Sequence, residues 1–259
     1  MPLLFSIIVS THGTDPSVFA ALLKNSDPEA ELIIADSTYD PEKKQYLRDS
    51  NYAQIVYVPI PYRLFPRDFC VGLNTALSFA EGEYIIRADD YLEFHKDFFT
   101  IAREDIEKFP DYLIIGQKSH APEEEPWRDY YSERGFFPSE RYVQIIDPAF
   151  TFSFGIVKRE ILDDVNGWDE RYDVSPVGED IDILHRLMIY LQGRVLLDKK
   201  LMGYGYRHSR IRFAMPLGTI LYALSKPEIE NGKFVAYNHR IIRAARAEAL
   251  AVKSEYIVR

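Results

Sequence analysis

The sequence predicts an α/β fold in which a mixed, mostly parallel sheet is flanked by helices. Strand-like and helix-like segments alternate through the first half of the 259 residues. Alternation of this kind indicates parallel strands joined by crossover helices. Acidic residues follow two of the strand-like runs, at Asp36 and at Asp89 and Asp90. Ligands of such folds bind at the carboxyl ends of the strands, so we expect a binding site there.

The elements of the first half follow from local patterns. Apolar, β-rich runs predict strands, a proline at position 41 predicts the start of a helix, and apolar residues at helical spacing predict a longer helix after Asp68. The expected elements are, in order, a strand over residues 5–10, a helix over 17–25, a strand over 31–35, a helix over 41–48, a strand over 55–58, a helix over 68–80 and a strand over 84–88.

The second half of the chain is less regular. Residues 120–141 form a long acidic and aromatic stretch, and loops of this length are uncommon unless they are functional or mobile. The other expected elements are a helix over residues 98–109, a strand over 113–116, a strand over 149–157, a helix over 181–191 and a strand over 193–197.

Composition and charge restrict the class of protein. The net charge of −9 argues against general nucleic-acid binding, and the single cysteine, Cys70, excludes an intramolecular disulfide and a Cys-rich zinc site. The apolar run at residues 2–10 is too short to cross a bilayer and has no basic flank, so we expect a cytoplasmic protein. The sequence contains no GxGxxG motif and no P-loop, which argues against dinucleotide oxidoreduction and Walker-type nucleotide hydrolysis.

The most informative segment is residues 82–91, Gly-Glu-Tyr-Ile-Ile-Arg-Ala-Asp-Asp-Tyr. An apolar strand ends there in two adjacent carboxylates, Asp89 and Asp90, which repel each other and are expensive to bury unpaired. A divalent cation such as Mg²⁺ or Mn²⁺, shared with a substrate diphosphate, would neutralise them. The alternative is a strand end that simply turns into solvent.

Several short motifs occur in a characteristic order along the chain. They are Ser6-Ile-Ile-Val-Ser-Thr-His12, Ile33-Ile-Ala-Asp36, Gly72-Leu-Asn74, the segment 82–90, Gly167-Trp168-Asp-Glu170, Gly178-Glu-Asp180 and the downstream His208. In this order and spacing they resemble the family 2 glycosyltransferases of the GT-A fold. The resemblance implies a GT-A domain over residues 1–210, with residues 211–259 as a C-terminal helical extension that packs on the domain or flanks it. It also implies an inverting enzyme that moves a sugar from a nucleoside diphosphate donor, in the first place a UDP-sugar, to a hydroxyl acceptor such as a glycan.

The resemblance assigns donor-binding roles to five residues. It implies that Ser10 and Thr11 form the nucleotide-facing edge, that Asp36 lies near the uracil or ribose, and that Asn74 also contacts the donor. Asp89 is expected to contact the ribose or the waters of the metal. A carboxylate can accept a hydrogen bond from a ribose hydroxyl or a base N–H, although Asp36 could equally be a residue that opens a turn.

The metal site is expected to depart from the family pattern. Asp89 and Asp90 match the DxD signature, but its third position is Tyr91. The resemblance therefore implies Asp90 as the direct ligand of Mn²⁺ or Mg²⁺, with His208 as a further ligand. Binding through one carboxylate leaves more water on the ion, which Mg²⁺ tolerates.

Catalytic and acceptor roles are implied for the later motifs. Asp180 matches the general base, which takes a proton from the acceptor hydroxyl, and Glu179 would orient the acceptor or the base. The alternative is that both are favourable charges in the first turn of a helix. Trp168 is expected to stack on an acceptor sugar or to pack in the core. Trp127, in the 120–141 stretch, is expected to help shape the acceptor site or to lie in an exposed insertion.

The C-terminal tail differs in charge from the rest of the protein. Between residues 233 and 259 six Lys and Arg residues stand against Glu248 and Glu255, a net charge of +4. Ile242, Ala249 and Val252 fall on one helical face, which predicts a helix docked on its own domain. The alternative is a basic amphipathic helix in peripheral contact with an anionic membrane.

Two other functions remain as alternatives. A sugar-phosphate nucleotidyltransferase also combines an α/β sheet with metal-binding carboxylates, but it needs a Gly-rich, basic N-terminal loop, and residues 11–15 are a poor version of one. A non-catalytic sugar-nucleotide-binding protein is the other alternative, and the intact Asp180 argues against it.

Overall fold

The structure is a computed structural model, and it describes residues 3–12, 15–38, 40–60, 68–120, 141–145, 152–174, 178–205, 229–230, 233–234 and 242–258. The predictions made for Trp127 and His208 lie outside these residues.

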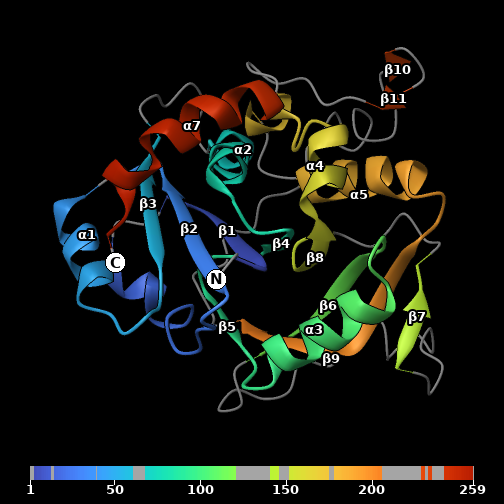
Figure 1. The fold of residues 1–259 in the computed structure, drawn as a ribbon, viewed down its shortest axis with the longest axis horizontal. Coiled ribbons are helices and arrows are strands. Elements are labelled where there is room, and N and C mark those ends of the chain that lie inside the picture. The colour runs from blue at the N-terminus through green and yellow to red at the C-terminus, as the bar shows by residue number, and fades with distance from the viewer. Residues whose placement is uncertain are drawn as a thin grey trace.

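A sheet of nine strands, counted over the described residues, forms the centre of the molecule, and its first half is parallel (Figure 1). The strands lie side by side in the order β3, β2, β1, β4, and each runs parallel to its neighbour. They are almost entirely buried, as expected for parallel strands covered by helices on both faces. Their bounds are β1 (Phe5–Thr11), β2 (Ala30–Asp36), β3 (Ile55–Pro59) and β4 (Tyr84–Arg87).

The second half of the sheet is mixed. Strand β8 runs antiparallel to β4 and to β6, β6 runs parallel to β9, and β5 and β7 both pair antiparallel with β9. The bounds are β5 (Leu92–Phe94), β6 (Leu113–His120), β7 (Tyr142–Gln144), β8 (Gly155–Lys158) and β9 (Val195–Gly205), and a separate hairpin joins β10 (Ile229–Glu230) and β11 (Lys233–Phe234). The mixed α/β architecture is confirmed.

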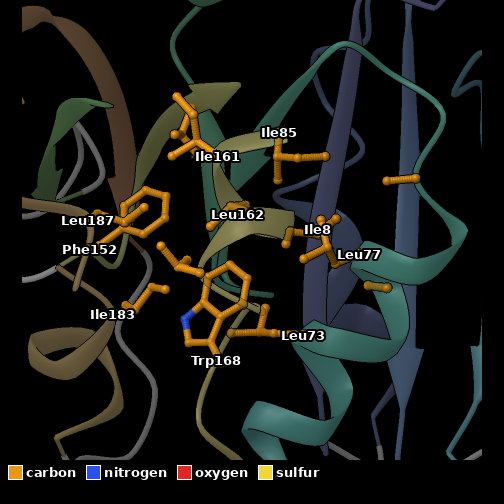
Figure 2. Packing of buried hydrophobic residues seen from close by; sticks show 14 of the residues in the cluster. Ile8, Leu73, Leu77, Ile85, Phe152, Ile161, Leu162, Trp168, Ile183 and Leu187 are labelled. Carbon is orange, nitrogen blue, oxygen red and sulfur yellow. The ribbon is translucent and has the colours of Figure 1, made fainter. Parts of the chain in front are cut away.

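Two hydrophobic cores lie on the two faces of this sheet. In β1, Ile8 belongs to the core that includes Leu73 and Leu187, whereas Ile7 and Val9 belong to the other. Helices α2, α4, α5 and α7 contribute to the first core (Figures 1 and 2), and α3 and η1 to the second. The helices are η1 (Pro16–Ala20), α1 (Pro41–Arg48), α2 (Phe69–Phe79), α3 (Phe98–Lys108), α4 (Arg159–Asp164), η2 (Glu170–Val174), α5 (Glu179–Tyr190) and α7 (Ile242–Tyr256).

The sequence-based elements differ from the structure in a few places. The α-helix expected over residues 17–25 is wrong: the segment forms the short 3₁₀ helix η1, whose first turn is capped by the Asp15 side chain. The polar residues Lys24 and Asn25 follow soon after η1, so the apolar segment is too short to form a stable α-helix. The short elements β5, β7 and α4 had no recognisable pattern. Strand β6 extends beyond Gly116 to His120, which brings Lys118 into the sheet.

Helix α7 of the C-terminal tail lies across α2 (Figure 1). Arg246 Nη2 donates to the backbone oxygen of Leu77 at 3.1 Å. Lys253 is only 5% exposed, and its Nζ lies 2.5 Å from Glu31 Oε2 and 2.6 Å from Glu81 Oε2. The tail is therefore tied to the first strands of the sheet by a buried cation that the apolar pattern did not reveal.

The described basic residues of α7 all pair with carboxylates of the same chain. Arg243 lies 2.5 Å from Asp164, Arg246 contacts Asp163, and Lys253 is paired as described above. This arrangement agrees with the predicted helix docked on its own domain, and the alternative of peripheral membrane contact through this helix stays a prediction. Within the described part of the chain, no helix has the length and apolar character needed to span a membrane.

Candidate active site

A buried arginine lies at the centre of the charged residues that end β4. Arg87 is 1% exposed, and its Nη2 lies 3.4 Å from Asp89 Oδ1 and 3.0 Å from Asp180 Oδ1. The ring of Phe69, at the start of α2, lies 5.4 Å from the guanidinium carbon. One side chain therefore links the end of the parallel half of the sheet to the first turn of α5.

Asp89 is neutralised by the protein itself. Lys118 Nζ, from β6, contacts Asp89 Oδ2, and the Tyr91 hydroxyl donates to the same oxygen at 2.9 Å. Burial acts to raise the pKa of Asp89, but the charges of Lys118 and Arg87 outweigh it and lower that pKa to about 2. Asp89 therefore does not need a bound metal ion to balance its own charge, because two protein cations already surround it.

Asp90 has a different environment from its neighbour. It is partly exposed at the end of the strand, and Thr11 Oγ1, at the end of β1, donates to Asp90 Oδ2 at 2.6 Å. No group of three or more metal-binding His, Cys, Asp or Glu side chains occurs among the described residues. A hard cation bound at this position would be held by one carboxylate, with water and substrate oxygens as its other ligands.

Glu179 and Asp180 open helix α5 as the sequence predicted. Gly178 precedes them with φ 112°, a backbone conformation that residues with a side chain rarely adopt. The turn at this glycine places both carboxylates in the first turn of the helix. Burial raises the pKa of Glu179, and the adjacent Asp180 charge raises it further. Burial also raises the pKa of Asp180, while Arg87 opposes that shift. Asp180 is 22% exposed, so its carboxylate remains accessible to a proton donor.

Asp36 is not available to a donor nucleotide in this arrangement. It is completely buried, and its Oδ2 accepts from Lys43 Nζ at 2.7 Å and from the Tyr57 hydroxyl at 2.5 Å. Its Oδ1 accepts from the backbone N and the hydroxyl of Thr38 at 2.8 and 2.9 Å. We therefore revise the expected donor contact: Asp36 fixes the end of β2 and the turn that follows.

Ser10 and Asn74 lie where α2 meets its neighbours. A methyl group added to Gly72 would lie 2.1 Å from Ser10 Oγ, so the serine side chain faces α2 at close range. Asn74 Nδ2 donates to the backbone oxygen of Trp168 at 2.8 Å and to Glu170 Oε1 at 3.1 Å, and its Oδ1 accepts from Trp168 N at 2.9 Å. Asn74 therefore holds α2 against the loop at residues 167–170, whereas Ser10 only lies close to α2, and the donor role of Ser10 stays a prediction.

Trp168 lies in the core rather than at a surface. It is 0% exposed, and its ring stacks on Phe152 with centroids 6.1 Å apart. Figure 2 shows the indole between Leu73 of α2 and Ile183 of α5. The expectation that it stacks on an acceptor sugar is therefore replaced by the packing alternative.

The roles of Arg87 and Lys118 were not among the predictions from the sequence. A signal for Arg87 was present, because a cation in an apolar strand needs a buried partner and position 87 shares a strand face with Asp89. Lys118 follows an expected strand end, so its role appears only once β6 is seen to continue past Gly116. Together these residues supply two positive charges around Asp89 and Asp180.

The cluster combines two kinds of chemistry. Lys118 is 22% exposed and offers a cation that an anionic group can reach, and Asp90 offers a ligand for a hard cation. Asp180, with its raised pKa, is suited to accept a proton from a hydroxyl. A site of this composition can stabilise a departing anion and activate an attacking hydroxyl.

Comparison with known proteins points to one family. The sequence model described as glycosyl transferase family 2 matches residues 6–165, more than half of the chain. No curated protein matches. Similar solved structures include Staphylococcus aureus TarS 1-349 in complex with UDP-GlcNAc, at 14% identity and TM-score 0.60, covering 80% of this chain and 60% of that one. The same TarS fragment in complex with UDP is 16% identical with TM-score 0.59, covering 79% and 61%.

The likeness to TarS, at this level of identity, shows the fold. The chain spans about 60% of the length of these TarS fragments. The matched residues 6–165 contain the parallel strands β1 (except its first residue), β2, β3 and β4 and the carboxylates at the end of β4, whereas α5 follows them. The chain belongs to glycosyl transferase family 2 and has the GT-A fold.

Proposed function

We propose that this chain is an inverting glycosyltransferase that moves a sugar from a UDP-sugar to a hydroxyl group of an acceptor glycan. The observation that carries the proposal is the Arg87–Asp180 ion pair, which joins the first turn of α5 to the carboxylates that end β4. Family membership supports a nucleotide-sugar donor. The TarS structures with UDP-GlcNAc and UDP support uracil as the base of that donor.

The reaction is a single displacement. The acceptor oxygen attacks the anomeric carbon and passes its proton to Asp180, while the bond from that carbon to the diphosphate breaks and its electrons leave with UDP. Attack opposite to the leaving group inverts the anomeric configuration. The raised pKa of Asp180 favours this role, because a general base works best when its pKa is close to the working pH. Glu179 orients the acceptor or the base.

The donor side is assigned to the ends of β1, β4 and β6. Lys118 is the accessible cation next to Asp89, and it favours an anionic diphosphate at this edge. Thr11 acts by holding Asp90 in place. Asp89, already paired with Lys118 and Arg87, contributes to the donor side through the ribose or through water.

We further propose that Asp90 is the protein ligand of Mg²⁺ or Mn²⁺. Such an ion would neutralise charge on the departing diphosphate. The support is the partly exposed Asp90 carboxylate, oriented by the Thr11 hydroxyl at the strand end. His208 as a further ligand and Trp127 as an acceptor contact stay predictions.

A thermal-shift screen tests the proposed function without knowledge of the acceptor. Unfolding temperature is measured with UDP, a panel of nucleotide sugars, and nucleoside triphosphates with sugar phosphates, each with Mn²⁺ and with EDTA. We expect UDP and one or more UDP-sugars to stabilise the protein, because a ligand that binds only the folded state raises its stability. Lys118→Met should weaken this stabilisation, and the exposed Lys24→Met should not. Stabilisation by triphosphates with sugar phosphates alone would instead favour a nucleotidyltransferase.

A further inference from the structure

Arg87 is too deeply buried to bind a substrate directly. Only 1% of its surface is exposed, and the Phe69 ring covers one side of the guanidinium. Its Nη2 lies between Asp89 and Asp180, while Nε and Nη1 have no hydrogen-bond partner within the part of the chain that the structure describes. A group placed in this way acts through its two neighbours, because a substrate cannot reach it.

We propose that Arg87 is a positioning residue that holds the Asp180 carboxylate against the end of β4, where Asp89 lies. The inference rests on the proposed function, in which Asp180 is the general base. It adds that donor-side and acceptor-side carboxylates share one buried cation, so that the two halves of the reaction are aligned before substrates bind.

Removal of this cation leaves Asp180 with an unfavourable balance of charge. Among the described residues, the charged and titratable groups around it are Arg87 on β4, Asp89 just after β4, Lys118 on β6, Glu179 on α5 and Cys70 on α2. Burial raises the pKa of Asp180, Arg87 is the largest influence that lowers it, and Asp89 raises it. Without Arg87 the carboxylate therefore retains its proton to higher pH and loses the contact that orients it.

Arg186 provides a matched control. It is also buried, at 3% exposure, and pairs with Asp182 at 2.8 Å. Its Nη1 donates to the backbone oxygens of Val165 and Gly167 at 2.9 and 2.8 Å, so this arginine holds a loop in place. Loss of either arginine removes a buried cation, but only loss of Arg87 changes the surroundings of Asp180.

The test measures hydrolysis of the UDP-sugar that best stabilises the protein, as a function of pH. Arg87→Met should lower kcat by about 10²-fold, because small displacements of a reacting group have effects of this size. It should also move the acidic limb of the kcat profile to higher pH by about one unit or more, since an opposite charge at this range shifts a carboxyl pKa by that amount. Arg186→Met should lower the unfolding temperature without moving that limb.

Two further variants make the result decisive. On an Asp180→Asn background, Arg87→Met should cause no additional loss of kcat, because the arginine acts through a group that is already gone. Arg87→Lys keeps the charge, so it should retain the acidic limb but not the full kcat, since one ammonium cannot reproduce the planar fork. If Arg87→Met does not fold, Arg87→Lys still tests the positioning role through its loss of kcat.

An acidic limb that stays in place in Arg87→Met, or losses that add fully with Asp180→Asn, would overturn the positioning role and leave the proposed function intact. Near-normal turnover of Asp180→Asn alone would instead remove the proposed function.

Discussion

The ends of two strands in the parallel half of the sheet each carry an ion pair with a buried cation, and the two pairs differ in how many of their hydrogen bonds are made. At the end of β2, Asp36 accepts four hydrogen bonds, including those from Lys43 and Tyr57, and neither Asp36 nor Lys43 has any exposed side chain. At the end of β4, Arg87 pairs with Asp180 at 3.0 Å, but Asp180 Oδ1 has no aligned hydrogen bond within the described residues.

The difference separates a scaffold from a site. A buried polar cluster whose hydrogen bonds are all made is rigid and contributes to a unique fold. Buried groups without aligned partners, and carboxyl groups with raised pKa values, are instead concentrated where ligands bind and react. By this criterion the Asp36 cluster supports the edge of the sheet, and the Arg87 cluster is where chemistry takes place.

The largest expected effect is on turnover at the unsatisfied cluster. Asp180→Asn keeps the size of the side chain but removes the proton acceptor, so kcat should fall by about 10²–10⁴-fold. UDP should bind with nearly unchanged affinity, because Asp180 serves the acceptor. Steady-state kinetics and calorimetric titration with UDP measure the two quantities. If turnover survives the change, Glu179 or Glu170 becomes the candidate base.

The second effect is on stability at the satisfied cluster. Lys43→Met leaves the Asp36 carboxylate buried without its cation, and breaking a buried pair in this way destabilises by about 3–5 kcal/mol. Lys24 pairs with Glu93 at 2.6 Å but is 48% exposed, so Lys24→Met should change the free energy of unfolding by about 1 kcal/mol or less. Urea denaturation compares the two variants. If the two variants lose the same free energy of unfolding, the buried Lys43–Asp36 pair contributes no more to stability than the exposed Lys24–Glu93 pair.

A third prediction concerns the metal at Asp90. UDP affinity should be higher with Mn²⁺ than in EDTA, and Asp90→Ala should abolish this difference. Thr11→Val removes the hydroxyl that orients Asp90 and should weaken Mn²⁺ binding by about 10–100-fold, as loss of a ligand's hydrogen-bond partner does elsewhere. Titration of Mn²⁺ into the UDP complex measures this. If the wild-type protein binds UDP with the same affinity in EDTA as with Mn²⁺, the assignment of Asp90 as a metal ligand is wrong.

The smallest effect is expected at a third buried carboxylate, Asp105. It accepts from Arg141 Nη2 and from the Tyr142 hydroxyl, each at 3.0 Å, and burial together with the nearby Asp198 raises its pKa. A carboxyl whose pKa is raised by folding binds its proton more tightly in the native state, so its contribution to stability is present at low pH and is lost as pH rises through the native pKa.

Asp105→Asn mimics the protonated form and should reduce the loss of stability between pH 5 and pH 8, by about 1–2 kcal/mol. Asp111→Asn, at a side chain that is 60% exposed, is the matched control and should keep the wild-type dependence. Chemical denaturation at the two pH values gives the comparison. An unchanged dependence of stability on pH in Asp105→Asn would mean that Asp105 does not change its protonation on unfolding.

Local patterns were enough to predict much of the fold. Strands β1, β2, β3 and β4 differ from their expected bounds by no more than a residue or so at either end, and α1 matches its bounds, because apolar runs and helix-starting signals act over a few residues. Helix α5 begins at Glu179, two residues before the expected bound at residue 181.

Side-chain direction at the site was harder to predict. The sequence indicates that Asp36 ends a strand, but the position of Lys43, which turns the carboxylate inward, depends on how α1 packs. In the same way Asn74 faces Trp168 because α2 meets a loop more than ninety residues later. Arg87 contacts Asp180 across a similar separation in the sequence, so this contact could be recognised only in the folded structure.

The most direct test of the account is the anomeric configuration of the product. The account has one general base at the Arg87 cluster and a single displacement, so an α-linked UDP-sugar should give a β-linked product. Proton NMR of the first-formed product, recorded before mutarotation when water is the acceptor, distinguishes the two anomers. A β product supports the Asp180 mechanism, and an α product would contradict it, because retention requires a different sequence of steps at this site.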